Sequence, residues 1–265
     1  MTELTGDLRD DAWFSRAAEH RPDAIVHTAA VVHHSRRGGE EMHEVNVGAT
    51  VRLVRPAARA HCRMIFVSTS GTVGCSRDPD ARPDEDAPFC EPVVSRWPYY
   101  ASKIEAERQA RALADELGVE LVIVRPPVML GPGDWRLRST GHIARLLRGR
   151  VPFIVPGSIH FVDVRDVSAA LVRLISLPRP RIVYNMPGTS WSLATFFEQC
   201  ARLGGVAKPR QLPGRAAWLL SSGAEALSRL FGGDPGSLLP DPVAARRVPD
   251  FRPSSRPLRC ASLRP

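Results

Sequence analysis

The chain has 265 residues, of which 43% are hydrophobic, and it carries a formal net charge of +8. This composition suits one large domain, or one domain with a small lobe, and excludes a disordered chain. The positive charge comes from scattered arginines without a basic tract or a recognised motif, so the sequence gives no ground for nucleic-acid binding.

Short apolar runs alternate with amphipathic stretches over the first 190 residues. In chain order, the sequence predicts a helix over 10–20, a strand over 24–27, a helix over 40–60 with a kink or break at Pro56, a strand over 64–68, a helix over 99–117 stopped by Gly118, and strands over 119–124 and 181–185. Continuous apolar strands between helices are typical of a parallel sheet covered on both faces. We therefore predict an α/β fold.

The pattern changes after residue 185 to helices joined by Gly/Pro-rich turns. Residues 191–203 and 213–231 are predicted to be helical. The second helix is apolar over much of its surface, which fits either packing against the main sheet or a lid over a lipophilic substrate. The region from residue 249 lacks periodicity and is predicted to be irregular or disordered. The predicted divisions are 1–190, a sheet domain; 191–248, a small and mostly helical lobe; and 249–265, a tail.

Five cysteines lack any Cys-x-x-Cys spacing, so neither a disulfide framework nor a zinc site is predicted. Three histidines, His27, His33 and His34, lie close together, but adjacent residues do not point both rings to one side of a regular element, and we predict no metal site. The sequence has no N-terminal signal peptide and no apolar run long enough to span a bilayer. We therefore expect a cytoplasmic protein without a membrane span.

Tyr99 and Lys103 form the most informative spacing, in a chain with only three tyrosines and two lysines. Four residues make about one helical turn, so the phenol and the ammonium share a face. A neighbouring cation lowers the pKa of a phenol from its usual value of about 10. Such a tyrosine can give or take a proton at a carbonyl or an alcohol near neutral pH. The spacing alone fits an exposed pair on an ordinary helix equally well.

A Ser/Thr-rich turn follows the predicted strand 64–68, in the run Ser68-Thr69-Ser70-Gly71-Thr72. Parallel sheets hold ligands at the carboxyl ends of their strands. Ser70 is placed there to hydrogen-bond the same substrate oxygen that Tyr99 would protonate. The alternative is a strand-end turn whose hydroxyls only cap the backbone.

Together these residues resemble the extended short-chain dehydrogenase/reductase family, which includes NAD-dependent epimerases/dehydratases and dihydroflavonol-reductase-like enzymes. The resemblance covers roughly residues 5–190 as an ordered series of motifs. It implies a Rossmann-like fold, NAD or NADP as cofactor, and a small-molecule substrate. It also implies that Tyr99 is the general acid/base, that Lys103 lowers the pKa of Tyr99 and holds the nicotinamide ribose, and that Ser70 polarises the substrate oxygen.

The resemblance also assigns cofactor contacts along the chain. They are Asp7 and Leu8 beside the adenine, Thr28, Ala29 and Ala30 under the ribose and phosphates, Asn46 on the helix 40–60, Tyr99 and Lys103, and Pro126 and Val128 beside the nicotinamide. Residues 161–167 resemble a segment that opens a helix near the substrate lobe.

The family's Gly-x-x-Gly-x-x-Gly turn, which lets a pyrophosphate approach a helix N-terminus, does not occur before Gly6. The resemblance therefore implies that the first two strands, and the residue that selects NAD or NADP, are missing. The C-terminal tail also departs from the family's usual ending.

Three functions follow from this pattern. The first is an NAD(P)-dependent oxidoreductase that transfers hydride to or from a secondary alcohol or ketone of a small or lipophilic substrate. The second is a nucleotide-sugar epimerase or dehydratase, with Arg138, Arg145, Arg148 and Arg215 as candidate diphosphate contacts. The third is a cofactor-deficient, non-catalytic remnant. The family also leads us to expect a homodimer formed through the helix that bears Tyr99 and its neighbour.

Overall fold

The structure is a computed structural model, and it describes residues 3–32, 39–76, 81, 83–95 and 97–213. The predicted helix over 213–231, apart from its first residue, and the predicted tail over 249–265 lie outside the described residues. Arg215 lies outside them as well.

Four parallel strands form the main sheet in the order β1 (Ala24–His27), β2 (Arg63–Val67), β3 (Leu121–Arg125) and β7 (Val183–Asn185). Their register pairs His27 with Phe66, and Val67 with Val124. The carboxyl ends of β1, β2 and β3 therefore meet at one edge. All four strands were predicted, β1 with its observed bounds, and the α/β fold is confirmed.

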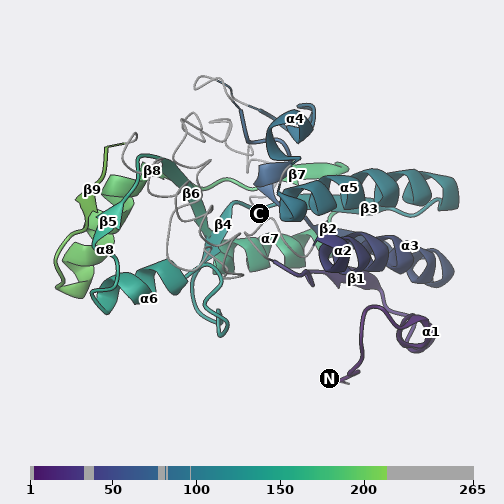
Figure 1. Ribbon diagram of the computed structural model, residues 1–265. Helices are drawn as coiled ribbons and strands as arrows, with labels where there is room; N and C mark the ends of the chain where they lie inside the picture. The colour runs from purple at the N-terminus through teal and green to yellow at the C-terminus, as the bar shows by residue number, and fades with distance from the viewer. Residues whose placement is uncertain (1–2, 33–38, 77–80, 82, 96, 214–265) are drawn as a thin grey trace.

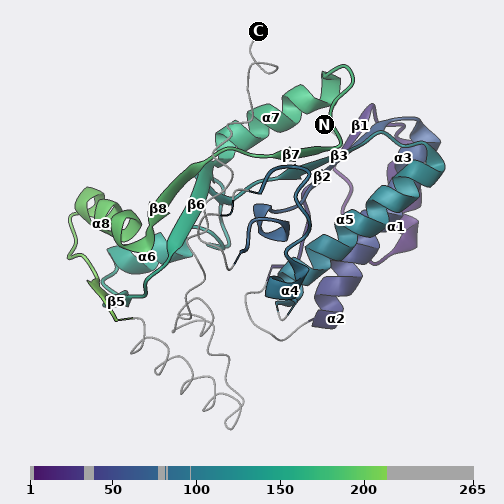
Figure 2. The ribbon, with the colours of Figure 1, turned by 90° about the horizontal axis from the view of Figure 1, so that it is seen from above.

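Helices cover both faces of this sheet, as Figure 2 shows. One face carries α1 (Asp11–Glu19), α3 (Ala49–Ala60) and α5 (Pro98–Leu117), and the other carries α7 (Val164–Ser176). Alternate residues of β2 serve the two faces, since Phe66 joins the cluster under α3 and α5 while Ile65 joins the cluster under α7. Burial on both faces explains why the strands read as unbroken apolar runs.

A small lobe lies beyond one end of the main sheet (Figure 1). Its elements are β4 (Val128–Leu130), α6 (Gly141–Leu147), β5 (Phe153–Ile154), β6 (Ser158–Asp163), β8 (Thr189–Ser192), α8 (Leu193–Gly204) and β9 (Arg210–Gln211). The strands pair in the order β4-β6-β8, and β5 pairs with β9. An apolar cluster around Leu146, Ile154, Phe196 and Phe197 holds the lobe together. The lobe thus draws on chain from both sides of residue 190.

Two details of the prediction are wrong. The helix does not break at Pro56, since α3 continues through this buried residue and its neighbours pack into the core; a kink there stays a prediction. The irregularity comes earlier, where α2 (Gly39–Met42) passes into a π-helical turn, η1 (His43–Gly48). Trp191 does not begin a helix, since it pairs with Ile159 as part of β8, and α8 begins at Leu193 after its N-cap, Ser192.

Candidate active site

Helix α5 carries Tyr99 and Lys103 in its first two turns. Pro98 stands at the first helical position, where a missing N–H costs nothing, and Gly118 ends the helix with φ +66°. The two side chains lie on the face turned toward the sheet. Tyr99 is partly buried, and Lys103 is 2% exposed. The pair is therefore not an exposed pair on an ordinary helix.

The hydroxyl turn, residues 68–72, follows β2 and contains the short helix η2 (Ser70–Thr72). The Thr69 side chain accepts a hydrogen bond from the Gly71 amide at 3.2 Å, and the Ser70 amide donates to the Pro126 carbonyl at 2.9 Å. A Cβ added at Gly71 would collide with the Tyr100 ring. The turn is thus closed onto both β3 and α5, and only glycine fits at its centre.

Tyr99 pairs with Thr69, which the sequence did not single out. Burial raises the pKa of Tyr99 to about 12, and the hydrogen bond with Thr69 opposes that rise. The expected lowering of this pKa by Lys103 is not found: burial and the Thr69 hydrogen bond are the causes that act on the Tyr99 pKa, and Lys103 is not among them. Ser70 lies next to Thr69 in the same turn, and its predicted contact with substrate stays a prediction. The signal for Thr69 was its own hydroxyl, directly before the chosen position Ser70 in the same run.

Lys103 is held beneath the turn. Its ammonium donates to the Val67 carbonyl at 3.0 Å and lies 4.7 Å from the centre of the Phe66 ring. Burial lowers the pKa of Lys103 to about 8, and the nearby Glu107 carboxylate acts in the opposite direction. Burial also lowers the pKa of His27 to about 3, with the Lys103 charge as the second cause. His27 is therefore neutral, and its ring makes a hydrogen bond with Thr50 at 3.0 Å.

Asn46 lies in the π-helical turn and is fully buried. Its side-chain amide donates to the Val31 carbonyl and to Ser102 Oγ, each at 3.0 Å, and its carbonyl accepts from the Val31 amide at 2.8 Å. Ser102 in turn donates to the Tyr99 carbonyl at 2.8 Å. Through these partners Asn46 ties the segment after β1 to α5, and its predicted contact with a cofactor stays a prediction.

The other predicted cofactor contacts fall in three places. Thr28 and Ala29 are exposed where β1 ends, and Ala30 is half-buried. Val128 is 40% exposed where the chain leaves β3, whereas Pro126 is buried under the hydroxyl turn.

The third place is the N-terminal segment, which forms no strand. Asp7 is exposed there and binds Arg9, which lowers the pKa of Asp7 to about 2. Leu8 packs against the core cluster under α3.

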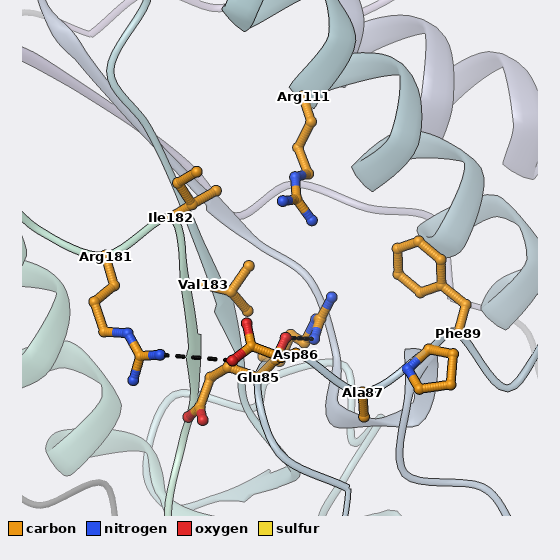
Figure 3. Close-up of a pocket in the computed structure, with 10 residues that line it drawn as sticks. Glu85, Asp86, Ala87, Phe89, Arg111, Arg181, Ile182 and Val183 are labelled. Atoms are coloured by element: carbon orange, nitrogen blue, oxygen red, sulfur yellow. Dashed lines mark hydrogen bonds and ion pairs between the residues drawn. The ribbon is translucent and has the colours of Figure 1, made fainter.

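A hollow of about 380 Å³ lies between residues 85–89, the start of β7 and α5 (Figure 3). Arg111 and Arg181 reach toward it, and Arg181 lies 4.0 Å from the Asp86 carboxylate. Its lining contains neither Tyr99 nor Lys103. The hollow is therefore separate from the Tyr99 site.

The described residues contain no group of three or more His, Cys, Asp or Glu side chains that could hold a metal ion. None of their helices has the length and hydropathy needed to cross a membrane.

A Rossmann-like parallel sheet that brings a Tyr–Lys pair and a hydroxyl turn to its carboxyl edge is typical of the extended short-chain dehydrogenases/reductases. The chain belongs to the NAD dependent epimerase/dehydratase family, whose model matches residues 2–186.

Known proteins of this kind resemble the chain over much of its length. It is 30% identical over 210 residues to sterol demethylase protein B of Methylococcus capsulatus, covering 77% of this chain and 62% of that protein. It is 33% identical over 175 residues to cinnamoyl-CoA reductase 1 of Petunia hybrida, covering 62% and 50%. The chain thus spans about half to three-fifths of the length of these relatives. The solved UDP-glucose 4-epimerase of Thermus thermophilus in complex with NAD superposes with a TM-score of 0.66 at 23% identity, covering 94% of this chain and 78% of that one.

Proposed function

We propose that the protein is an NAD(P)-dependent oxidoreductase that transfers hydride between a nicotinamide and the carbonyl carbon of a small or lipophilic substrate. The observation that carries the proposal is the pairing of Tyr99 with Thr69, one helical turn from the buried Lys103, at the carboxyl edge of the sheet. That edge is where parallel sheets hold their ligands.

The residues at this edge fit the nicotinamide half of a dinucleotide. Thr28 and Ala29 are small and exposed at the end of β1, and Val128 is exposed beyond β3, so a cofactor can approach the backbone closely. In this proposal Lys103, buried at the same edge, holds a ribose hydroxyl. When bound, the nicotinamide supplies the hydride chemistry, which no side chain can provide.

Tyr99 acts as the proton donor in this proposal. Its pKa of about 12 keeps the phenol protonated at neutral pH, so it can give its proton to a carbonyl oxygen that gains negative charge. Thr69, and Ser70 beside it, offer hydroxyl hydrogen bonds to the same oxygen. The protonated phenol is the form that carbonyl reduction requires of its acid.

A lipophilic substrate is supported by the loop that follows β4. Trp135 is 93% exposed and Leu137 is 46% exposed, while the Asp134 carboxylate accepts three backbone amides and the Thr140 hydroxyl and so fixes the loop. A fixed loop that presents apolar side chains suits an apolar ligand. The resemblance to cinnamoyl-CoA reductase agrees with a reductase rather than an epimerase.

The proposal is tested by titrating the purified chain with NADH and NADPH and following nucleotide fluorescence. Saturable binding of either nucleotide is expected. A flat titration up to millimolar nucleotide would overturn the proposal and favour the cofactor-deficient remnant.

A substrate assay separates the reductase from the epimerase. We expect the protein to consume NADPH with cinnamoyl-CoA or a dihydroflavonol, and not to epimerise UDP-glucose with NAD. The reverse result would favour the epimerase.

We also infer a homodimer and a cytoplasmic location. Free thiols at Cys62, Cys75, Cys90 and Cys200 suit a reducing compartment. Sedimentation of the purified chain tests the dimer, and a monomer at micromolar concentration would contradict it.

A further inference from the structure

We propose that Glu107 is a positioning residue of the active site, which fixes the hydroxyl turn of residues 68–72 to the helix that carries Tyr99 and Lys103. This inference rests on the proposed function, because the turn and the helix are its acid/base site. Glu107 lies on α5 one turn after Lys103 and has no exposed surface.

The Glu107 carboxylate clamps both ends of the turn. Its Oε1 atom accepts the Ser68 hydroxyl at 2.5 Å. It also lies 3.2 Å from Thr72 Oγ1, whose single proton is shared between Glu107 and the Thr69 carbonyl at 3.0 Å, and both hydroxyl residues are buried. Thr69 and Ser70, the residues offered to substrate, lie between these two anchors. A carboxylate that holds both ends therefore sets the distance from Thr69 to Tyr99.

Arg125 offsets the cost of burying the Glu107 carboxylate. Its guanidinium donates from Nε to both carboxylate oxygens at 3.1 Å and from Nη2 to Oε2 at 2.5 Å, and Arg125 is 2% exposed. A charge buried this deeply without a partner would strongly destabilise the fold. Arg125 ends β3, directly before Pro126, whose carbonyl accepts the Ser70 amide. The pair thus joins the ends of β2 and β3 to α5.

Glu107 also acts on the charge of Lys103. Burial disfavours the ammonium, and Glu107 is the group that favours it. The other titratable groups around these residues are His27 on β1, which faces Lys103, and Arg125 on β3, which faces Glu107. The charge of Glu107 therefore favours the ammonium form of Lys103, and a neutral glutamine at this position would not.

The chain allows a direct measurement because it has only two lysines, Lys103 and Lys208. NMR of lysine-labelled protein gives two side-chain signals, and the exposed Lys208 serves as the internal reference. In Glu107→Gln the Lys103 signal should titrate about 1 pH unit lower than in the wild type, because an opposite charge is lost. The matched control is Glu105→Gln, on the exposed side of the same helix, and it should leave both signals unchanged. An unshifted Lys103 signal in Glu107→Gln would overturn the proposal.

A second variant keeps the ion pair and removes only the clamp. In the double variant Ser68→Ala, Thr72→Val, the Glu107–Arg125 pair remains, so the protein should fold and Lys103 should titrate as in the wild type. We expect kcat to fall at least about 10-fold with KM changed less than about 2-fold, because proton transfer depends on alignment. Wild-type kcat in this variant would contradict the positioning role.

The two proposals fail in different ways. If the wild type shows no turnover with any nicotinamide cofactor, the proposed function fails, while the Lys103 titration still decides the role of Glu107.

Discussion

The carboxyl edge of the main sheet and the small lobe are stabilised by different interactions. At the edge, Asn46, Lys103, Glu107 and Arg125 are almost fully buried, and each is hydrogen-bonded to other parts of the protein. In the lobe, the interior is an apolar cluster of aliphatic and aromatic side chains, and the ion pair between Lys208 and Glu198 lies on the surface.

This difference separates two tasks. Buried charges add little net stability, but they fix the directions of the groups around them when every hydrogen bond is satisfied. Apolar packing gives stability and shape without fixing any proton. Substitutions at the edge should therefore change chemistry and titration, and substitutions in the lobe should change stability.

The largest effect on the edge is expected from Tyr99→Phe. Removal of the phenolic proton should lower kcat about 10²- to 10⁴-fold, while NADPH affinity stays nearly unchanged. Steady-state kinetics and nucleotide fluorescence measure the two quantities. Tyr184→Phe, on the face under α7, is the control and should keep wild-type kcat. Turnover at the wild-type rate in Tyr99→Phe would refute the role of Tyr99.

The lobe should respond to Phe196→Ala through stability. Phe196 is 4% exposed and packs edge-on against Phe161 and Phe197, with ring centres 5.5 Å apart in both pairs. Loss of this ring should cost about 3–5 kcal/mol in the free energy of unfolding, measured with urea. The Lys103 titration should not move in the folded variant, and a shift there would show that the lobe and the edge are coupled.

The carboxyl edge should also make the free energy of unfolding depend on pH, through His27. The pKa of His27 falls from 6.5 in the unfolded chain to about 3 in the folded one, so the unfolded state binds the proton more readily between these values. Above pH 6.5 the contribution of His27 to the free energy of unfolding is fully present. As the pH drops from 6.5 toward 3, the free energy of unfolding falls by up to about 1.4 kcal/mol per pH unit.

Substitution of His27 tests this pH dependence. In His27→Gln the slope should become shallower but not flat, because burial also lowers the pKa of His160 to about 4. Urea unfolding at pH 4.5 and 7 measures the effect. An unchanged slope in His27→Gln would contradict it.

The smallest effect is expected from an ion pair on the surface of α5. Arg108 binds Glu91 at 2.5 Å, but about half of each side chain is exposed. Arg108→Gln should lower stability by less than about 1 kcal/mol and leave kcat unchanged. A cost as large as that of breaking the Glu107–Arg125 pair would remove the distinction between buried and exposed charges.

Much of the fold was predictable because its signals are local. The apolar run 24–27 gives β1 as observed, and Gly118 ends α5 at the predicted residue because it adopts φ +66°. Trp191 was misassigned because its strand exists only through pairing with β6, a contact about 30 residues away along the chain. The π-helical turn that holds Asn46 could not be predicted from the amino-acid composition of that segment.

By itself the sequence determined that Tyr99 and Lys103 share one helix face, since a four-residue spacing acts within one turn. Only the tertiary structure decided what that face meets. Burial raises the pKa of Tyr99 and lowers that of Lys103, Thr69 pairs with the phenol, and Glu107 meets Arg125 across 18 residues of chain. Desolvation and ion pairing depend on the groups that surround a side chain, and those groups come from strands and helices far apart in the sequence.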